Sequence, residues 1–469
     1  MVREIVWGLL MAAMMGAGPA MGGEVEEVPP RQNEDQPKAK IVVIGVDGVS
    51  LNLLQPMLER GVMPQMERLL LRGRAMPLTS IWPLRTPQVW TSAVTGKYPG
   101  QHGIWDHRSN TYFNPPPVRT KKNKRVTSRD RRSKALWKIL DEEGYKTLTV
   151  GWVASWPAEV LKNGGMIAPM ELIGDARQTS IKPSFYRGTP NAVTPVALHK
   201  EMESKYVEAS EIRASDLKEF ASLPPRRSPL YKLPRLRRYT YALKWSLARA
   251  RSVEKLTLAG FDKLTPEVVF SYFQCSDTLL HRFWIFQESQ RAIRRRFREH
   301  GISRRHVAEL KRRFGGVVQG CYADIDRRVG RILKHVADSQ TLVVLLSDHG
   351  FGPAKVPHQM PGEPYSGSHL EDGVLLLSGP GVRTSGGEVS ASILDITPTL
   401  LTYLGEARGE DMPGRVLHDL FDSIKYPSSR TITSYEVTPQ QNIPFREGWP
   451  PRHIRTKAEL ALAENAQGY

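Results

Sequence analysis

The stretch that decides the fold is Lys40-Ile-Val-Val-Ile-Gly-Val-Asp47-Gly48, an unbroken apolar run that ends in an aspartate and a glycine. Strands buried on both faces of a parallel sheet have such continuous runs, whereas half-exposed strands alternate. Residues 268–274, 342–347 and 374–378 have the same character. Helical patterns lie between these runs, at about 50–60, 64–73, 87–95, 133–143, 303–338 and 391–404. Strands that alternate with helices predict a three-layer α/β/α fold.

The chain is expected to have five segments. Arg3, the apolar run from Ile5 to about Gly18 and the small residues after it are typical of a secretory signal peptide at 1–23. This predicts a secreted or periplasmic protein, and an uncleaved membrane anchor is the alternative. A polar, proline-rich linker follows. The expected segments are then the linker 24–38, an α/β core formed by 39–174 and 261–425, a mostly helical insertion at 175–260 that serves as a lid, and a C-terminal extension at 426–469.

The charge is strongly and locally basic. The formal net charge is +18, and residues 119–134, 226–251 and 291–313 carry nine, nine and ten Lys or Arg. Such stretches favour an anionic partner, either a membrane surface or a polyanion, although solvated helix faces would have the same composition. No specific nucleic-acid recognition is expected. The chain has two cysteines, Cys275 and Cys321, which excludes a disulfide framework and a cysteine-based zinc site.

Metal-binding residue types stand where the strands are expected to end. Asp47 ends the first run, and the strand at 268–274 leads into Cys275-Ser276-Asp277-Thr-Leu-Leu-His281. Ser276 is expected to cap a helix, which would place Asp277 and His281 on one helix face. Ligands bind beyond the carboxyl ends of strands in open α/β sheets. The candidate ligands are three aspartates and three histidines, a mixture that favours zinc and related ions: Asp47, Asp277, His281, Asp348, His349 and His369.

Thr86 is the candidate nucleophile. It precedes Pro87, and proline is favoured at the first position of a helix, so Thr86 is expected to be the N-cap. Its hydroxyl would then lie beside backbone N–H groups and the positive end of a helix dipole, which stabilise an alkoxide or a phosphoryl group. A simple capping role is the structural alternative for this residue.

Taken together, these motifs resemble the alkaline phosphatase superfamily and, within it, the type I phosphodiesterase/nucleotide pyrophosphatase family. The resemblance spans residues 40–404, in the family's order, apart from the 175–260 insertion. It rests on Gly45-Val46-Asp47-Gly48, Thr86-Pro87, the run from Thr95-Gly96 to His102-Gly103-Ile104, Asp277 with His281, Asp348-His349-Gly350, His369, and the run Asp395-Ile-Thr397-Pro398-Thr.

The resemblance implies an alkaline-phosphatase-like core that hydrolyses phosphate esters with two divalent metal ions, either zinc or manganese. Asp47, Thr86, Asp348 and His349 would bind one ion, and Asp277, His281 and His369 the other. One ion would lower the pKa of the Thr86 hydroxyl, and the pair would neutralise charge during an in-line displacement. The reaction would then pass through a phosphothreonine intermediate.

The sequence departs from the family at one substrate contact. Nucleotide pyrophosphatases usually have an asparagine shortly after the His-Gly-Ile element, whereas this chain reads Trp105-Asp106-His107-Arg108, with Asn110 slightly later. His107, Arg108 or Asn110 would then donate to phosphate, and nucleotide diesters become a doubtful substrate. Arg85, next to the expected nucleophile, is a candidate phosphate clamp or the partner in an ion pair.

Four other functions are alternatives to a phosphodiesterase. Sulfatases need a Cys or Ser nucleophile where this chain has Thr86-Pro87-Gln88. Phosphoethanolamine and phosphoglycerol transferases use a threonine but usually carry several membrane-spanning helices. A phosphomonoesterase remains open, because few contacts separate it from a diesterase. A non-catalytic basic module that binds a membrane or an anionic polymer is the alternative outside enzymes, and the complete ligand set argues against it.

Overall fold

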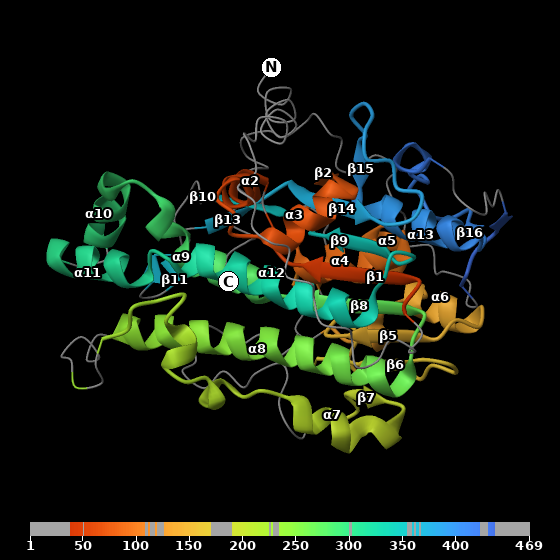
Figure 1. The fold of residues 1–469 in the computed structure, drawn as a ribbon, viewed down its shortest axis with the longest axis horizontal. Helices are drawn as coiled ribbons and strands as arrows, with labels where there is room; N and C mark the ends of the chain where they lie inside the picture. Colours follow the sequence, from red (N-terminus) through yellow and green to blue (C-terminus); the bar gives the residue numbers. More distant parts are fainter. Residues whose placement is uncertain are drawn as a thin grey trace, which may run out of the picture.

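The computed structural model describes residues 38–49, 51–107, 111–112, 118–119, 126–169, 190–224, 227, 234–299, 303–353, 359–360, 363–364, 367–422 and 430–436. Its centre is a nine-stranded sheet in the order β15-β2-β14-β9-β1-β8-β5-β6-β7. Helices cover both faces of this sheet (Figure 1). The three-layer α/β/α fold expected from the sequence is therefore confirmed.

The middle of the sheet is parallel. The strands concerned are β1 (Ile41–Val46), β8 (Val268–Phe273), β9 (Leu342–Leu346), β5 (Thr147–Val150) and β6 (Gly165–Ile167). Strand β14 (Asp372–Ser378) is antiparallel both to β9 and to β2 (Gly73–Thr79), and the short β15 (Ala391–Ser392) continues the sheet beyond β2. The prediction that residues 374–378 form another parallel strand was therefore wrong. A strand buried on both faces has the same composition in either direction.

Alternate residues of β1 enter two separate cores, which explains its unbroken apolar run. Val42, Ile44 and Val46 pack into one core, and Ile41 and Val43 into the other. The first core is covered by α2 (Leu51–Glu59), α3 (Pro64–Leu71), α8 (Pro234–Leu264), α9 (Cys275–Phe283) and α12 (Val317–Val336). The second is covered by α4 (Thr86–Thr95), α6 (Leu136–Glu142) and α13 (Ile396–Leu404).

Residues 175–260 were expected to form a lid, but their described part belongs largely to the core. β7 (Val193–Thr194) pairs with β6 as the last strand of the sheet. Helix α8 packs against β5, β8 and α12, and Figure 1 shows it running alongside α12. Leu243, Leu247 and Val253 of α8 are buried in the first core. A basic helix with a buried apolar stripe therefore covers the sheet, and α7 (His199–Lys205) packs on it.

The helical pattern at 303–338 is divided into two helices. α11 (Arg304–Phe314) ends at Gly315-Gly316, after which α12 begins at Val317. With α10 (Gln290–Glu299), α11 forms a pair that projects from one end of the molecule (Figure 1). The remaining short elements are α5 (Pro99–His102), β10 (Gly350–Pro353), β13 (Gly367–Leu370), β16 (Arg408–Gly409), β17 (Thr431–Ile432), β3 (Thr111–Tyr112), β4 (Val118–Arg119), β11 (Gln359–Met360) and β12 (Glu363–Pro364).

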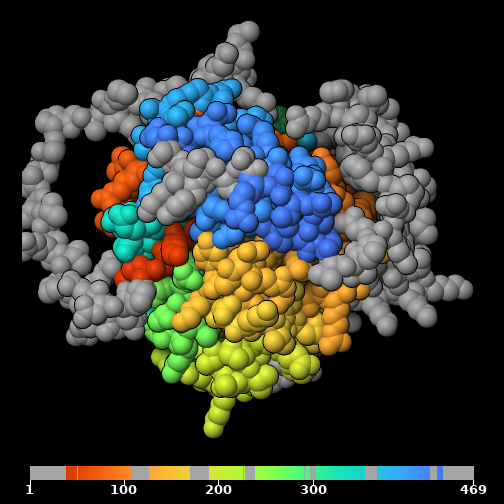
Figure 2. Space-filling model, turned by 90° about the vertical axis from the view of Figure 1, so that its right-hand side faces the viewer, coloured from red at the N-terminus to blue at the C-terminus, as the bar shows by residue number. Residues whose placement is uncertain are grey.

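Part of the C-terminal extension is bound to the core. β17 pairs with β16, Tyr435 is buried, and Glu436 accepts a hydrogen bond from the buried Lys97 at 2.9 Å. Figure 2 shows this face, where C-terminal residues (blue) lie above the segment 126–169 (orange to yellow). The yellow-green residues that follow Pro190 lie below that segment. The expected signal peptide 1–23, nearly all of the linker 24–38 and residues 437–469 lie outside the described residues.

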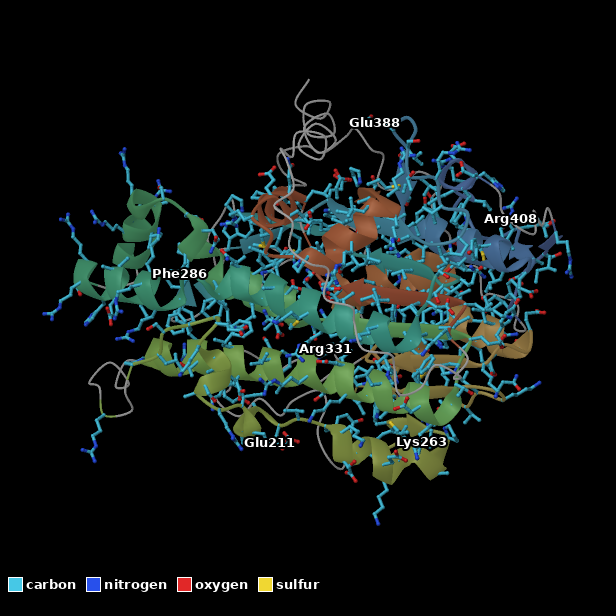
Figure 3. The ribbon with its side chains drawn as sticks, viewed as in Figure 1. Glu211, Lys263, Phe286, Arg331, Glu388 and Arg408 are labelled. Carbon is cyan, nitrogen blue, oxygen red and sulfur yellow. The ribbon has the colours of Figure 1, made fainter. Side chains whose placement is uncertain are left out.

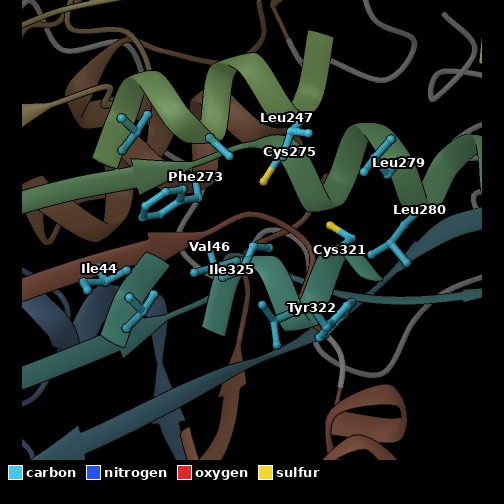
Figure 4. Packing of buried hydrophobic residues seen from close by; sticks show 14 of the residues in the cluster. Ile44, Val46, Leu247, Phe273, Cys275, Leu279, Leu280, Cys321, Tyr322 and Ile325 are labelled. Atoms are coloured by element: carbon cyan, nitrogen blue, oxygen red, sulfur yellow. The ribbon is translucent and has the colours of Figure 1, made fainter. Parts of the chain in front are cut away.

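The two cysteines are both buried and form no disulfide. Their sulfur atoms face each other between α9 and α12, within the first core (Figure 4). A hydrogen bond with Cys275 and burial raise the pKa of Cys321 well above its usual value, so it stays a thiol. Among the described helices, none combines the length and the apolar character that a membrane span requires.

Candidate active site

Three neighbouring strands carry the candidate ligands at their carboxyl ends. β1 lies between β9 and β8 in the sheet. Asp47 directly follows β1, and Asp348 and His349 follow β9 one residue later. Asp277 lies in the first turn of α9, which begins after β8. Because parallel strands end at the same edge of the sheet, these side chains meet there.

The first cluster is formed by Asp47, Asp348 and His349, all fully buried. The Nε2 atom of His349 lies 3.3 Å from Oδ1 of Asp47 and 3.4 Å from Oδ2 of Asp348. None of these three atoms has a hydrogen-bond partner among the described residues. Buried polar atoms are nearly always hydrogen-bonded, so three orphaned ligand atoms around one point fit a bound cation.

The second cluster is formed by Asp277, His281 and His369. Oδ1 of Asp277 lies 3.1 Å from Nε2 of His281 and 3.1 Å from Nε2 of His369. The spacing of four residues does place Asp277 and His281 on one face of α9. His369 is brought there by β13, which pairs with β10 directly after Asp348-His349. The side chains of this cluster are about a tenth exposed, so it is the more accessible of the two.

All three histidines present the same nitrogen to these clusters. The Nδ1 atoms of His281, His349 and His369 lie 3.0–3.1 Å from the carbonyl oxygens of Gly367, Gly350 and Leu84. A carbonyl only accepts, so each Nδ1 donates, and each Nε2 faces a cluster, where it can bind a metal ion once it carries no proton. The Nε2 atoms of His281 and His369 are 3.0 Å apart. Two lone pairs at that distance repel each other unless a cation lies between them, so this cluster also fits a metal ion.

The two clusters adjoin each other. The rings of His349 and His369 stack with their centroids 3.6 Å apart. Burial and the charge of Asp277 raise the pKa of Asp47, and burial and Asp47 raise that of Asp348. Burial and the neighbouring His349 lower the pKa of His369 to about 3, which keeps this imidazole neutral. Crowded buried carboxylates are an environment that a pair of divalent ions would stabilise.

The carboxylates and the histidines shift each other's pKa values. Burial alone lowers the pKa of His349, but Asp348 and Asp47 outweigh burial and raise it to about 10. Burial raises the pKa of Asp277, whereas His281 and His369 lower it more strongly, to well below its usual value. Each cluster therefore attracts positive charge, in the form of protons or of a metal ion.

Thr86 lies beside this edge of the sheet. It is buried, and it is the first residue of α4, the helix that lies against β1. His369 donates to the carbonyl of Leu84, two residues before Thr86, so the second cluster is tied to this loop. The first N–H groups of a helix have no partner within the helix, and Pro87 has none to offer. The N–H groups of Thr86 and Gln88 are thus at the positive end of α4.

Two expected helix caps were wrong by one residue or more. The N-cap of α4 is Arg85, with extended backbone angles, and Thr86 is already helical. The N-cap of α9 is Gln274, and the hydroxyl of Ser276 instead donates to the carbonyl of Asp47. The second difference arises from the tertiary structure, because a hydroxyl that is bonded elsewhere is not available as a cap. Neither helix has a hydrogen bond from a side-chain cap.

The expected substrate contacts are placed only in part. Arg85 is buried next to Thr86, and His107 is half-buried, with its carbonyl accepting from the N–H of Val126. Arg108 and Asn110 lie outside the described residues.

Sequence reasoning missed the residues that support the ligands. Ser347 accepts from the N–H of Val49 and donates to the carbonyl of His349, and the N–H of Gly48 reaches Asp348 at 3.3 Å. Gly48 has φ 74°, in the left-handed region, which lets the chain turn directly after Asp47. Tyr272 donates to Asp47 from the neighbouring strand. A serine before Asp348 and a glycine after Asp47 are visible in the sequence, but their partners depend on strand order.

The fold and the site therefore define a class: an α/β protein with two candidate metal-ligand clusters beyond its parallel strands and a threonine at the adjacent helix start. The sequence profile of the type I phosphodiesterase / nucleotide pyrophosphatase family matches residues 41–384. This match covers more than half of the chain, so the chain belongs to that family. A comparison with curated proteins found no match.

Solved structures with a similar fold are distant in sequence. Phosphonoacetate hydrolase from Sinorhizobium meliloti 1021 is 14% identical, with a TM-score of 0.39 over 70% of this chain and 60% of that one. This chain therefore spans less than two thirds of that relative. Murine ectonucleotide pyrophosphatase / phosphodiesterase 5 is 13% identical, with a TM-score of 0.43 over 81% and 99% of the two chains. A putative sulfatase from Bacteroides thetaiotaomicron VPI-5482 is 14% identical, with a TM-score of 0.43 over 82% and 74%.

Proposed function

We propose that this protein is a two-metal phosphodiesterase or pyrophosphatase that acts through a phosphothreonine intermediate at Thr86. The observation that carries the proposal is the pair of adjoining ligand clusters, whose six side chains present lone pairs toward two points next to the start of α4. Three carboxylates and three imidazole nitrogens favour zinc, with manganese as the alternative.

Each residue has a definite role in this proposal. Divalent ions bound to the clusters would supply the positive charge that lowers the pKa of a hydroxyl and neutralises the phosphoryl oxygens. Thr86 Oγ forms a bond to phosphorus as the bond to the leaving ester oxygen breaks, and water then cleaves the phosphothreonine and restores the hydroxyl. The N–H groups at the start of α4 stabilise the charge that develops on phosphate. Arg85 would hold a non-bridging oxygen, with His107, Arg108 and Asn110 as further donors.

A panel of chromogenic esters tests the proposal. Bis-p-nitrophenyl phosphate, p-nitrophenyl phosphate, p-nitrophenyl thymidine monophosphate and p-nitrophenyl sulfate are each assayed with added zinc or manganese. The highest kcat/KM is expected for one of the two phosphodiesters. A preference for p-nitrophenyl phosphate would make the protein a monoesterase, transfer of the phosphoryl group to another alcohol would make it a transferase, and a preference for the sulfate would overturn the phosphoesterase proposal.

A basic surface next to the site is proposed to attract anionic partners. α10 follows α9 through a short 3-10 turn at Trp284–Gln287, so it is continuous with the helix that carries Asp277 and His281. Figure 3 shows nitrogen-tipped side chains that point away from the body around α10 and α11. Their other face is apolar, with Ile293, Leu310 and Phe314 buried. The exposed arginines of this surface are Arg291, Arg294, Arg295, Arg304 and Arg305.

Charge reversal of Arg291, Arg294 and Arg295 to glutamate is expected to weaken binding to vesicles rich in phosphatidylglycerol, or to polyphosphate. The loss should be several-fold or more at low salt and should shrink as salt rises, because exposed charges are screened within about 10 Å at 0.1 M salt. Turnover at saturating substrate should stay nearly intact. The matched control reverses the exposed Arg60, Arg68 and Arg72, at the ends of α2 and α3. Unchanged binding at low salt, or an equal loss in the control, would show a merely solvated face.

Export is proposed from residues 1–23. The mature protein recovered from the cell envelope or medium is expected to begin between Gly22 and Glu24, as read by N-terminal sequencing. A protein recovered from the membrane with Met1 retained would support the uncleaved anchor, and recovery from the cytoplasm with Met1 retained would remove both possibilities.

A further inference from the structure

A buried tyrosine reaches the first cluster from the neighbouring strand. Tyr272 pairs in register with Gly45 of β1, and its Oη donates to Oδ2 of Asp47, two residues beyond Gly45. Successive side chains of a strand alternate between its faces, so Gly45 and Asp47 share a face. A Cβ atom at Gly45 would lie 3.2 Å from the Tyr272 ring and 2.7 Å from that of Trp90. Because Gly45 has no side chain, the Tyr272 ring has room to lie along β1 and reach Asp47.

The Tyr272 ring is held in this position by neighbouring aromatic side chains. Tyr272 is fully buried, and it contacts Trp90 edge-on with 4.9 Å between ring centroids and Trp152 at 5.9 Å. An ionised carboxylate only accepts, so the Tyr272 hydroxyl is the donor in its hydrogen bond to Asp47. Its direction is fixed by aromatic packing and its donor role by the surrounding negative charge.

This contact makes the two oxygens of Asp47 unequal. Oδ2 is occupied by Tyr272, whereas Oδ1 faces Nε2 of His349 and has no hydrogen-bond partner among the described residues. We infer that Tyr272 is a positioning residue that restricts Asp47 to one ligand oxygen, and that it thereby sets the affinity and geometry of the first metal site. The inference rests on the proposed two-metal function, but it concerns metal binding and not turnover.

The effect should be confined to one cluster. Asp277 of the second cluster is contacted by His281 and His369, and Tyr272 makes no described hydrogen bond to any of these three residues. A tyrosine that merely fills the core would, by contrast, change protein stability and leave both metal sites alike. Partners that orient a metal ligand typically change metal affinity by about 10–100-fold when they are removed.

The experiment compares Tyr272→Phe with Tyr435→Phe. Tyr435 is also buried, and its hydroxyl donates to the backbone carbonyl of Ala407, in the part of the molecule that binds the C-terminal segment. Metal-free proteins are titrated with zinc against a competing chelator and with cobalt, whose visible absorption reports ligand geometry. In Tyr272→Phe, one of two affinities should fall by about 10–100-fold, the other should be unchanged, and the cobalt spectrum should shift. Tyr435→Phe should resemble the wild type in both measurements.

The possible results separate this inference from the proposed function. A wild type that binds no ion would overturn both. A wild type that binds two ions, with unchanged affinities and cobalt spectrum in Tyr272→Phe, would overturn the role of Tyr272 alone, and so would an equal loss at both sites. If Tyr272→Phe does not fold, 3-fluorotyrosine at position 272 keeps the ring and strengthens the phenol as a donor. An unshifted cobalt spectrum in that protein would overturn the inference as well.

Discussion

Replacing Thr86 with alanine is expected to reduce the turnover of the preferred phosphate ester by several orders of magnitude, while the fold and both metal ions are retained. The reason is that alanine removes the atom that forms the covalent bond to phosphorus. Since Arg85 and not Thr86 is the N-cap of α4, and no side-chain cap is present, little stability should be lost. Kinetics, elemental analysis and thermal unfolding measure the three quantities.

Two further variants sharpen this prediction. Thr86→Ser keeps a hydroxyl with a less restricted χ1, so it should retain part of the activity. Thr91→Ala is the control, since Thr91 lies in the same helix, is also buried, and donates only to the carbonyl of Pro87 at 2.6 Å. Its turnover should stay within a few-fold of the wild type. Rapid quenching of the wild type with labelled substrate should leave phosphate on the peptide that contains Thr86.

The opposite result would be decisive. A Thr86→Ala protein that binds metal and hydrolyses every ester of the panel at near wild-type rate would rule out the phosphothreonine. The site would then have to activate water directly.

Removal of the metal ions is expected to abolish activity, and two equivalents of zinc or manganese per chain should restore it. Each cluster has three candidate ligands and, in the proposed mechanism, would contribute a different part of the charge neutralisation, so one ion should not suffice. Asp348→Asn should lower the stoichiometry to one by weakening the first cluster, and His369→Ala should do so through the second. Elemental analysis after reconstitution measures the stoichiometry, and the ester assay measures the activity.

The control for this series is His335→Ala. His335 lies on α12, pairs with Asp262 at 2.6 Å and belongs to neither cluster. It should bind two ions and keep its activity. Full activity in the metal-free wild type, or an unchanged stoichiometry in both cluster variants, would contradict the two-metal proposal.

Much of the fold was predictable because burial leaves a direct trace in composition. The runs at 41–46, 268–273 and 342–346 are almost entirely apolar, since each of these strands faces a helical core on both sides. The direction of β14 was not predictable from composition. Its side chains face the same two cores as those of the parallel strands, and its direction is set by backbone pairing with β2 and β9. The role of α8 was missed for a related reason. The many basic residues of α8 suggested an exposed helix, whereas its apolar residues form a buried stripe that covers β5 and β8.

The sequence by itself determined which residue types are available to the site and which strand ends carry them. Asp47, Asp277 and Asp348 were identifiable because each follows a buried strand at the edge where such sheets bind ligands. Their grouping into two clusters was implied only by the family resemblance, and its physical basis lies in the tertiary structure. The order β9-β1-β8 joins Asp47 to Asp348 and His349, while the return of β13 along β10 brings His369 to Asp277 and His281. Strand order and long-range pairing depend on the free energy of the whole packed molecule, which no local pattern contains.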